Sequence, residues 1–259
     1  MKDKLFSAAT LSLSSLLLIL LPLFMFSIPP ACAGEWRVIP IRLDFDKSTR
    51  SGVISIANDG KEPLTVSVEA DRWLQDADGK DRYEKSQDLI FFPKVLTIGA
   101  KEERVIRVGI KTPAIKEEKT YRLFISEDPG ARKPQGNKVA IAIRFGVPIF
   151  VKPLQENLQG EIRDVSLEHG TLGFSVANPG NLHFRINNII VTGTDAAQQQ
   201  VFTKELTGWY VLAGSSRAYS VEISRETCLK LRDLKLEVKA DGAVFNRNID
   251  VDQASCLSR

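Results

Sequence analysis

The most regular pattern of apolar and polar positions in the chain lies between Lys138 and Pro153. Large apolar side chains alternate there with small, charged or turn-forming residues, and this period of two predicts a long β-strand. Pro148 has no backbone N–H to donate to a central ladder, so we expect at least this end of the strand to lie at a sheet edge or a bulge. An apolar edge strand invites pairing with another chain, which predicts either a cover for the edge or a binding function. The apolar positions are Val139, Ile141, Ile143, Phe145, Val147 and Ile149.

Short alternating runs separated by turn residues continue along the rest of the chain and predict an all-β fold. The runs before the opening stretch lie at residues 38–45, 52–58, 65–73, 95–98, 104–110 and 121–126. Together with that stretch they fill one immunoglobulin-like β-sandwich. Further runs lie at residues 172–178, 186–193, 218–224, 234–240 and 243–251. We therefore expect two immunoglobulin-like domains, residues 34–153 and 161–259, joined by a polar linker at 154–160.

Two local features refine the expected second domain. The heptapeptides ISIANDG (54–60) and FSVANPG (174–180) share the order apolar-Ser-apolar-Ala-Asn-x-Gly, which indicates that the two domains are related in build. Ser224 is placed as an N-cap for a helix over residues 224–234, but that segment fits a loop entering a strand equally well.

The first residues have the pattern of an export signal. Lys2 and Lys4 precede a long apolar run, and Ala31 and Ala33 form a small-residue cleavage site before Gly34. We expect residues 1–33 to be a signal peptide, although an uncleaved membrane anchor is an alternative for so long a run. After cleavage no further membrane span is expected.

Cleavage would leave Cys228 and Cys256 as the two cysteines of the mature chain, which predicts a disulfide in an exported protein. The formal net charge is +3, and one unit of it belongs to the leader. So small a charge gives no sign of a nucleic-acid-binding surface.

The chain offers little chemistry for an enzyme. Its two histidines, His169 and His183, follow or occupy turns, stand in no metal-ligand spacing and are interpreted as surface or turn residues. Residues 76–81, DADGKD, resemble part of a calcium loop but lack its distal glutamate, which favours a hairpin turn. Arg42 lies inside an apolar run, where the pattern alone favours a strand arginine with its head in solvent over an anion-binding side chain. We therefore expect a binding protein without a metal or cofactor.

Several segments taken in order resemble the periplasmic pilus-assembly chaperones of the PapD type. They are IPIRLDFD (39–46), ISIANDGKEPLTVSVEADRW (54–73), FFPKVLTIGAKEERVIRV (91–108), YRLFISEDPG (121–130) and VAIAIRFGVPIFVKP (139–153). The resemblance implies two immunoglobulin-like domains set as an L, in the periplasm. It also implies that the last strand of the first domain is lent to pilin or fimbrial subunits that lack a strand, before delivery to an outer-membrane usher.

The resemblance assigns roles to particular residues. Val139, Ile141, Ile143 and Phe145 would enter the groove of the subunit. Arg42 matches the family's arginine for the C-terminal carboxylate of the subunit, whereas Pro148 occupies the place of the family's lysine, which indicates a divergent branch. Arg144 and Lys152 would each lie about 13 Å from that place along an ideal strand.

Glu118, Lys152 and Asp241 would correspond to the family's interdomain ion pairs. Self-association through the edge strand is an additional possibility for the free protein. The competing hypothesis is a secreted structural or adhesive β-sandwich of the cell envelope, in which the same strand is paired permanently.

Overall fold

The structure, a computed structural model, describes residues 36–128 and 142–257, so the predicted leader lies outside it. Nearly all regular structure in these ranges is β-strand, which confirms the predicted fold class. The first ten strands are β1 (Trp36–Ile39), β2 (Leu43–Phe45), β3 (Ser51–Asn58), β4 (Leu64–Gln75), β5 (Asp81–Lys85), β6 (Leu89–Phe92), β7 (Val95–Ile98), β8 (Glu103–Ile110), β9 (Lys119–Glu127) and β10 (Arg144–Val151). The later strands are β11 (Glu161–Glu168), β12 (Thr171–Ala177), β13 (Phe184–Thr194), β14 (Gln200–Thr207), β15 (Tyr210–Val211), β16 (Ser216–Glu222), β17 (Asp233–Ala240) and β18 (Ala243–Asp250).

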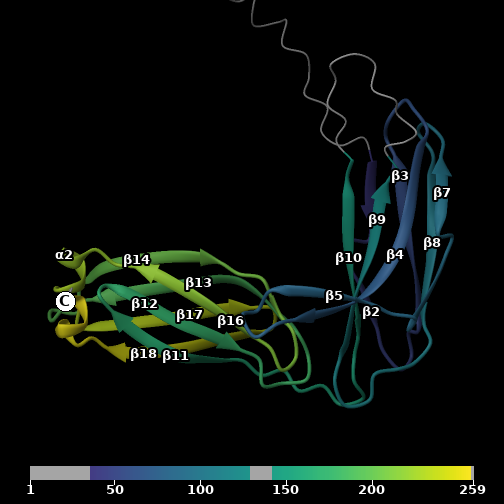
Figure 1. The fold of residues 1–259 in the computed structure, drawn as a ribbon. Helices are drawn as coiled ribbons and strands as arrows, with labels where there is room; N and C mark the ends of the chain where they lie inside the picture. Colours follow the sequence, from purple (N-terminus) through teal and green to yellow (C-terminus); the bar gives the residue numbers. More distant parts are fainter. Residues whose placement is uncertain (1–35, 129–141, 258–259) are drawn as a thin grey trace, which may run out of the picture. The chain divides into compact units, whose positions relative to one another are not determined.

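The first ten strands form a sandwich of two sheets, which we call the first sandwich (Figure 1). One sheet has the order β1-β3-β8-β6, and the other has the order β2-β10-β9-β4-β5 with β7 also paired to β4. The inward positions of both sheets build a continuous apolar core that includes Phe45, Ile54, Ile106, Leu123 and Ile149. Burying this alternating set is what selects the register of each strand.

The predicted run at residues 38–45 is divided into two strands that belong to different sheets. β1 pairs with β3, and β2 pairs in parallel with β10. Pro40 lies between them and has no N–H for the β1–β3 ladder, so the ladder ends there and the chain crosses to the opposite sheet.

The remaining strands form the second sandwich, with sheets β11-β12-β16 and β14-β13-β17-β18, and β15 paired to β13. Its own core includes Phe184, Leu231 and Leu236. Residues 154–160, where the sequence places the linker, contain no strand. No helix in the described ranges is long and apolar enough to cross a membrane.

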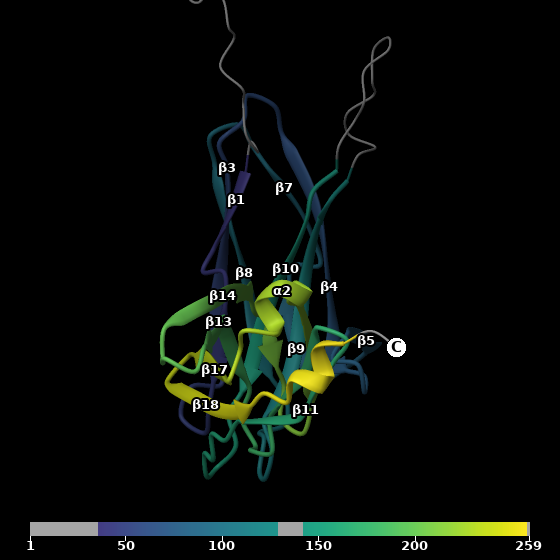
Figure 2. The same ribbon diagram turned by 90° about the vertical axis from the view of Figure 1, so that its left-hand side faces the viewer.

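A disulfide closes the far end of the second sandwich. The helix α2 (Arg225–Cys228) begins after Ser224, whose hydroxyl accepts a hydrogen bond from the Thr227 N–H, so the N-cap at Ser224 is confirmed. The helix has only four residues and the chain then enters β17 at Asp233, so both alternatives for residues 224–234 are correct in part. α2 lies beside the C-terminal end of the described chain in both views (Figures 1 and 2). The 3₁₀-helix η2 (Gln253–Cys256) ends there, and its Cys256 is bonded to Cys228, as predicted.

The repeated heptapeptide contains the same structural feature in each sandwich, a buried asparagine whose side chain hydrogen-bonds a turn to neighbouring segments. Asn178 is 1% exposed; its Oδ1 accepts from the Gly180 N–H at 3.0 Å. Its Nδ2 donates to the carbonyls of Leu182 and Val211 at 2.7 and 3.0 Å. Asn58 makes an equivalent set, with Oδ1 accepting from an N–H two residues ahead and Nδ2 donating to carbonyls of two other segments. The sequence echo therefore reflects a shared structural requirement.

Replacing Asn178 with Ala should lower the free energy of unfolding by about 2–4 kcal/mol, because three backbone groups lose their partner at once, in two buried hydrogen bonds and one partly buried one. Chemical denaturation measures this change. Asn248→Ala, at an exposed position of β18, is the matched control and should change stability by less than about 0.5 kcal/mol. Equal effects of the two substitutions would contradict the role of the buried amide.

Candidate functional site

The strand β10 is paired on both sides over only part of its length. β9 pairs with all of β10, whereas β2 pairs only with Ile149–Val151. Within the described residues, the segment 144–148 has β9 as its single neighbour. The predicted edge is therefore confirmed at Pro148 itself, whereas the end of the strand after Pro148 lies between β9 and β2. The Glu127 N–H donates to the Ile143 carbonyl, and in an antiparallel ladder the backbone groups of Arg144 and Gly146 then point away from β9. The first half of β10 thus offers an open backbone edge, except at the Gly146 carbonyl, which accepts a hydrogen bond from Arg122.

The predicted donor side chains fall partly outside the described residues. Val139 and Ile141 lie in the undescribed range 129–141. Ile143 and Phe145 are half-buried and pack against the core of the first sandwich. Phe145 also makes an edge-on contact with Trp36 of β1, with ring centroids 4.6 Å apart.

Arg42 lies just before β2, level with Pro148 of β10 in the parallel register. Its guanidinium donates to both carboxylate oxygens of Asp44, with Nε–Oδ2 at 2.8 Å, and lies 4.7 Å above the centre of the Phe150 ring. Burial would lower the pKa of Arg42, but the hydrogen bonds and charge of Asp44 outweigh it and raise the pKa above its ordinary value. The side chain is about one-third exposed, at 34%. Arg42 is therefore charged, oriented and within reach of solvent.

A second arginine, which the sequence analysis did not single out, faces the place of the missing lysine. Arg122 of β9 is the cross-strand partner of Pro148 and is 7% exposed. Its guanidinium stacks 3.9 Å above Trp73 and donates to the Gly146 carbonyl at 2.8 Å, while its Nε is buried with no partner among the described residues. Burial lowers the pKa of Arg122.

Both arginines lie over connected aromatic rings. Arg42 covers Phe150, Arg122 covers Trp73, and those two rings lie 5.9 Å apart. Tyr210 of the second sandwich packs against both rings, at 5.7 and 5.2 Å. Because neighbouring strands are about 4.8 Å apart, two positively charged groups flank Pro148 at a spacing of about 10 Å between backbones.

The structure does not bring Glu118, Lys152 and Asp241 together, although the resemblance implied ion pairs among them. Lys152 binds Glu156 four residues later, with Nζ–Oε1 at 3.1 Å. Asp241 donates its backbone N–H to the Arg185 carbonyl. Glu118 instead reaches across to the second sandwich.

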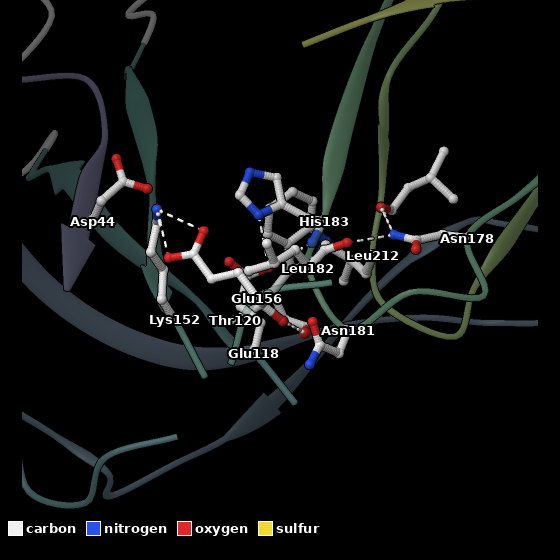
Figure 3. A network of polar contacts seen from close by, with 12 residues as sticks. Asp44, Glu118, Thr120, Lys152, Glu156, Asn178, Asn181, Leu182, His183 and Leu212 are labelled. Atoms are coloured by element: carbon white, nitrogen blue, oxygen red, sulfur yellow. Dashed lines mark hydrogen bonds and ion pairs between the residues drawn. The ribbon is translucent and has the colours of Figure 1, made fainter. Parts of the chain in front are cut away.

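Glu118 is almost completely buried and binds His183, as Figure 3 shows. Its Oε2 accepts from the backbone N–H of His183 at 2.8 Å and lies 2.7 Å from His183 Nδ1. Of the two alternatives for His183, a surface or a turn residue, the position directly after a turn is confirmed, whereas the side chain is only 8% exposed and does not lie on the surface. The reason is that its turn is held against the first sandwich: the Asn181 side-chain amide donates to the carbonyls of Lys116 and Gln155.

The DADGKD segment forms the predicted hairpin turn, between β4 and β5, and it also contacts the second sandwich. Gln75 donates to the Tyr210 carbonyl at 2.9 Å and accepts from the Leu212 N–H at 3.0 Å. Arg217 donates to the Gly79 carbonyl. Gly79 has φ +74°, and a Cβ there would lie 2.6 Å from the Ser216 carbonyl, so only glycine fits this contact.

Comparison with known proteins agrees with this architecture. Residues 37–156 match the family described as "Pili and flagellar-assembly chaperone, PapD N-terminal domain". Over its first sandwich, this chain belongs to the PapD-like family of pilus-assembly chaperones. Proteins described as "Probable fimbrial chaperone EcpB" from Escherichia coli O157:H7 are 29% identical over 174 residues, which cover 65% of this chain and 74% of theirs.

Solved structures of chaperones share the fold at low sequence identity. The CsuC–CsuE chaperone–tip adhesion subunit pre-assembly complex of Acinetobacter baumannii gives a TM-score of 0.55 at 18% identity, covering 73% of this chain and 91% of that chain. The YadV chaperone gives a TM-score of 0.54 at 14% identity, covering 84% of this chain and 100% of that chain.

Replacing Glu118 with Ala should lower the free energy of unfolding by about 2–3 kcal/mol, because the buried His183 backbone N–H and ring lose their acceptor. Glu117→Ala is the matched control at the adjacent, exposed position and should have an effect below about 0.5 kcal/mol. Urea denaturation of both variants compares them. If Glu118→Ala is as stable as Glu117→Ala, the contact between Glu118 and His183 does not contribute to stability.

Proposed function

We propose that this chain is a periplasmic chaperone that holds incomplete fimbrial subunits by donor-strand complementation and delivers them to an outer-membrane usher. The half-open edge of β10, in a member of this chaperone family, is the observation that carries the proposal. Its outward backbone groups supply pairing for a partner strand, and the apolar row that precedes Arg144 supplies side chains for the partner's groove. Each aliphatic side chain buried in that groove contributes roughly 1.5–3 kcal/mol.

The proposal includes an anchor for the C-terminal carboxylate of the subunit. Arg42 takes the place of the family's arginine, and we assign the second basic role to Arg122, which flanks Pro148 from the other side. A carboxylate at this place would pair with Arg42, which is within reach of solvent, and would lie near the positive charge of Arg122, whose guanidinium is buried in the free chain. Asp44 holds Arg42 in the free chain, so the subunit's carboxylate would exchange with Asp44 on binding.

The competing function is that of a secreted structural or adhesive module of the envelope. In that case the edge of β10 would be paired permanently, and the protein would remain with the envelope or the assembled fibre. Mass spectrometry of the proteins that co-purify with the full chain from a periplasmic extract distinguishes the two. A chaperone is recovered in complex with incomplete subunits.

Replacing Ile141 with Asp should reduce the recovery of co-purifying subunit at least about tenfold, because a charged side chain would enter an apolar groove. Ala142→Asp is the control, since its side chain lies on the opposite face of an extended segment. Pull-down from periplasmic extract, with thermal unfolding to check the fold, gives the comparison. Equal recovery from both variants would rule out the donor-strand mechanism.

Replacing Arg42 with Ala should weaken binding of the recovered subunit by about tenfold or more, the loss expected for a charge-assisted hydrogen bond. Lys152→Ala removes a nearby cation that pairs with Glu156, and it should change the affinity less than about threefold. Titration by surface plasmon resonance measures both. Small and equal losses would exclude Arg42 as the carboxylate anchor.

A further inference from the structure

A stack of three side chains joins the second sandwich to the proposed anchor. The His183 ring lies parallel to the Phe150 ring, with centroids 3.5 Å apart and an interplanar angle of 10°. The Arg42 guanidinium lies over the same phenyl ring, 4.7 Å from its centre. An imidazole stacked this closely covers one face of the phenyl ring, so the guanidinium occupies the other face.

We propose that His183, contributed by the second sandwich, is a positioning residue for Arg42 and acts through Phe150. Its importance for subunit binding rests on the proposed function, whereas the positioning itself does not. His183 holds the plane of Phe150, and that plane sets where a guanidinium finds the negative face of the ring.

The other contacts of Phe150 do not define its plane in this way. Trp73 and Tyr210 meet the ring at interplanar angles of 47° and 33°, with centroids 5.9 and 5.7 Å away. Among the described residues, His183 is the one ring recorded as stacked on Phe150. Phe150 is 0% exposed, so its orientation is determined by packing alone.

His183 is itself held in place from both sandwiches. Glu118 of the first sandwich binds its backbone N–H and its Nδ1. The Glu118 N–H donates to the Asn181 carbonyl two residues before His183, and Asn178 binds the Leu182 carbonyl directly before it. The network of Figure 3 therefore fixes the imidazole, and through it the face that Phe150 presents to Arg42.

Two substitutions separate the ring from the hydrogen bond. His183→Phe keeps a flat ring on Phe150 and removes the side-chain donor to Glu118, while the backbone N–H at position 183 still donates. His183→Asn keeps a donor and removes the ring. If stacking is the contact that positions Arg42, the guanidinium should keep its place in His183→Phe, as in the parent chain, and should lose it in His183→Asn.

The Nε–Hε resonance of Arg42 in the free, ¹⁵N-labelled chain reports the position of the guanidinium, because the Phe150 ring current shifts it upfield. Phe150→Leu gives the unshifted reference, and Arg42→Lys identifies the peak. His183→Asn should move this resonance at least halfway to the Phe150→Leu position, and His183→Phe should leave it in place. Lys152→Ala, near the same site, is the control and should not move it.

An unchanged resonance in His183→Asn would overturn the proposal, since Asp44 alone would then be sufficient to hold Arg42. If His183→Phe and His183→Asn move the resonance equally far toward the Phe150→Leu position, the proposal is also overturned, because the hydrogen bond to Glu118 would then be the contact that positions Arg42. Neither result depends on a subunit, so this experiment decides the positioning role even if the proposed function fails.

A double-mutant cycle then connects the stack to binding, with the subunit recovered by co-purification as the probe. His183→Asn should weaken binding by about fivefold in the parent chain and have no further effect once Arg42 is Ala. If the fold-losses in affinity of the two single variants multiply in the double variant, His183 acts independently of Arg42, which would contradict the proposal. If the parent chain binds no subunit, the proposed function is wrong and the resonance experiment stands alone.

Discussion

The burial of Phe150 is the contact on which the arrangement of the site depends. This residue lies on the outward face of β10, where a side chain of an isolated sandwich would meet solvent, yet it is 0% exposed. Trp73 from β4, Tyr210 from β15 and His183 cover it, and Leu212 completes the same apolar cluster. Removing so large a ring from water is favourable by a few kcal/mol and holds the two sandwiches to each other at β10, the strand proposed to bind the partner.

The same strand has two different environments, and its sequence explains both. From Ile149 onward, β10 lies between β9 and β2, and its side chains are buried on both faces. Before Pro148 its single neighbour in the described part of the chain is β9, since a residue without an N–H suits the point where the second ladder stops. A Cβ on Gly146 would lie 3.2 Å from the Phe124 ring, so the small residue there allows β9 and β10 to pack closely beside the edge.

Much of the fold followed from the sequence because burial of alternating side chains is a local signal. That signal is weak in outer strands. β5 and β14 carry mostly exposed, polar side chains, and the sequence analysis missed both. The site was harder to predict from the sequence. Arg122 becomes a neighbour of Pro148 only when β9 and β10 are paired in register, and a single sequence carries no signal of that register. The burial of the His183 side chain could not be predicted for the same reason, since its acceptor is 65 residues away.

The contact between Phe145 and Trp36 limits how much of the strand can be lent to a partner. Trp36 is 4% exposed, and the edge-on ring of Phe145 covers it where β1 and β10 approach each other. Moving Phe145 into a partner's groove would expose Trp36 and lose an aromatic contact worth about 0.5–1.5 kcal/mol, in addition to the buried area. Ile143 lies two residues earlier, packs against the core without an aromatic partner among the described residues, and is released at lower cost. If β10 acts as the proposed donor strand, the energetics therefore favour a donor segment that ends at Ile143, with Phe145 retained in the core of the first sandwich.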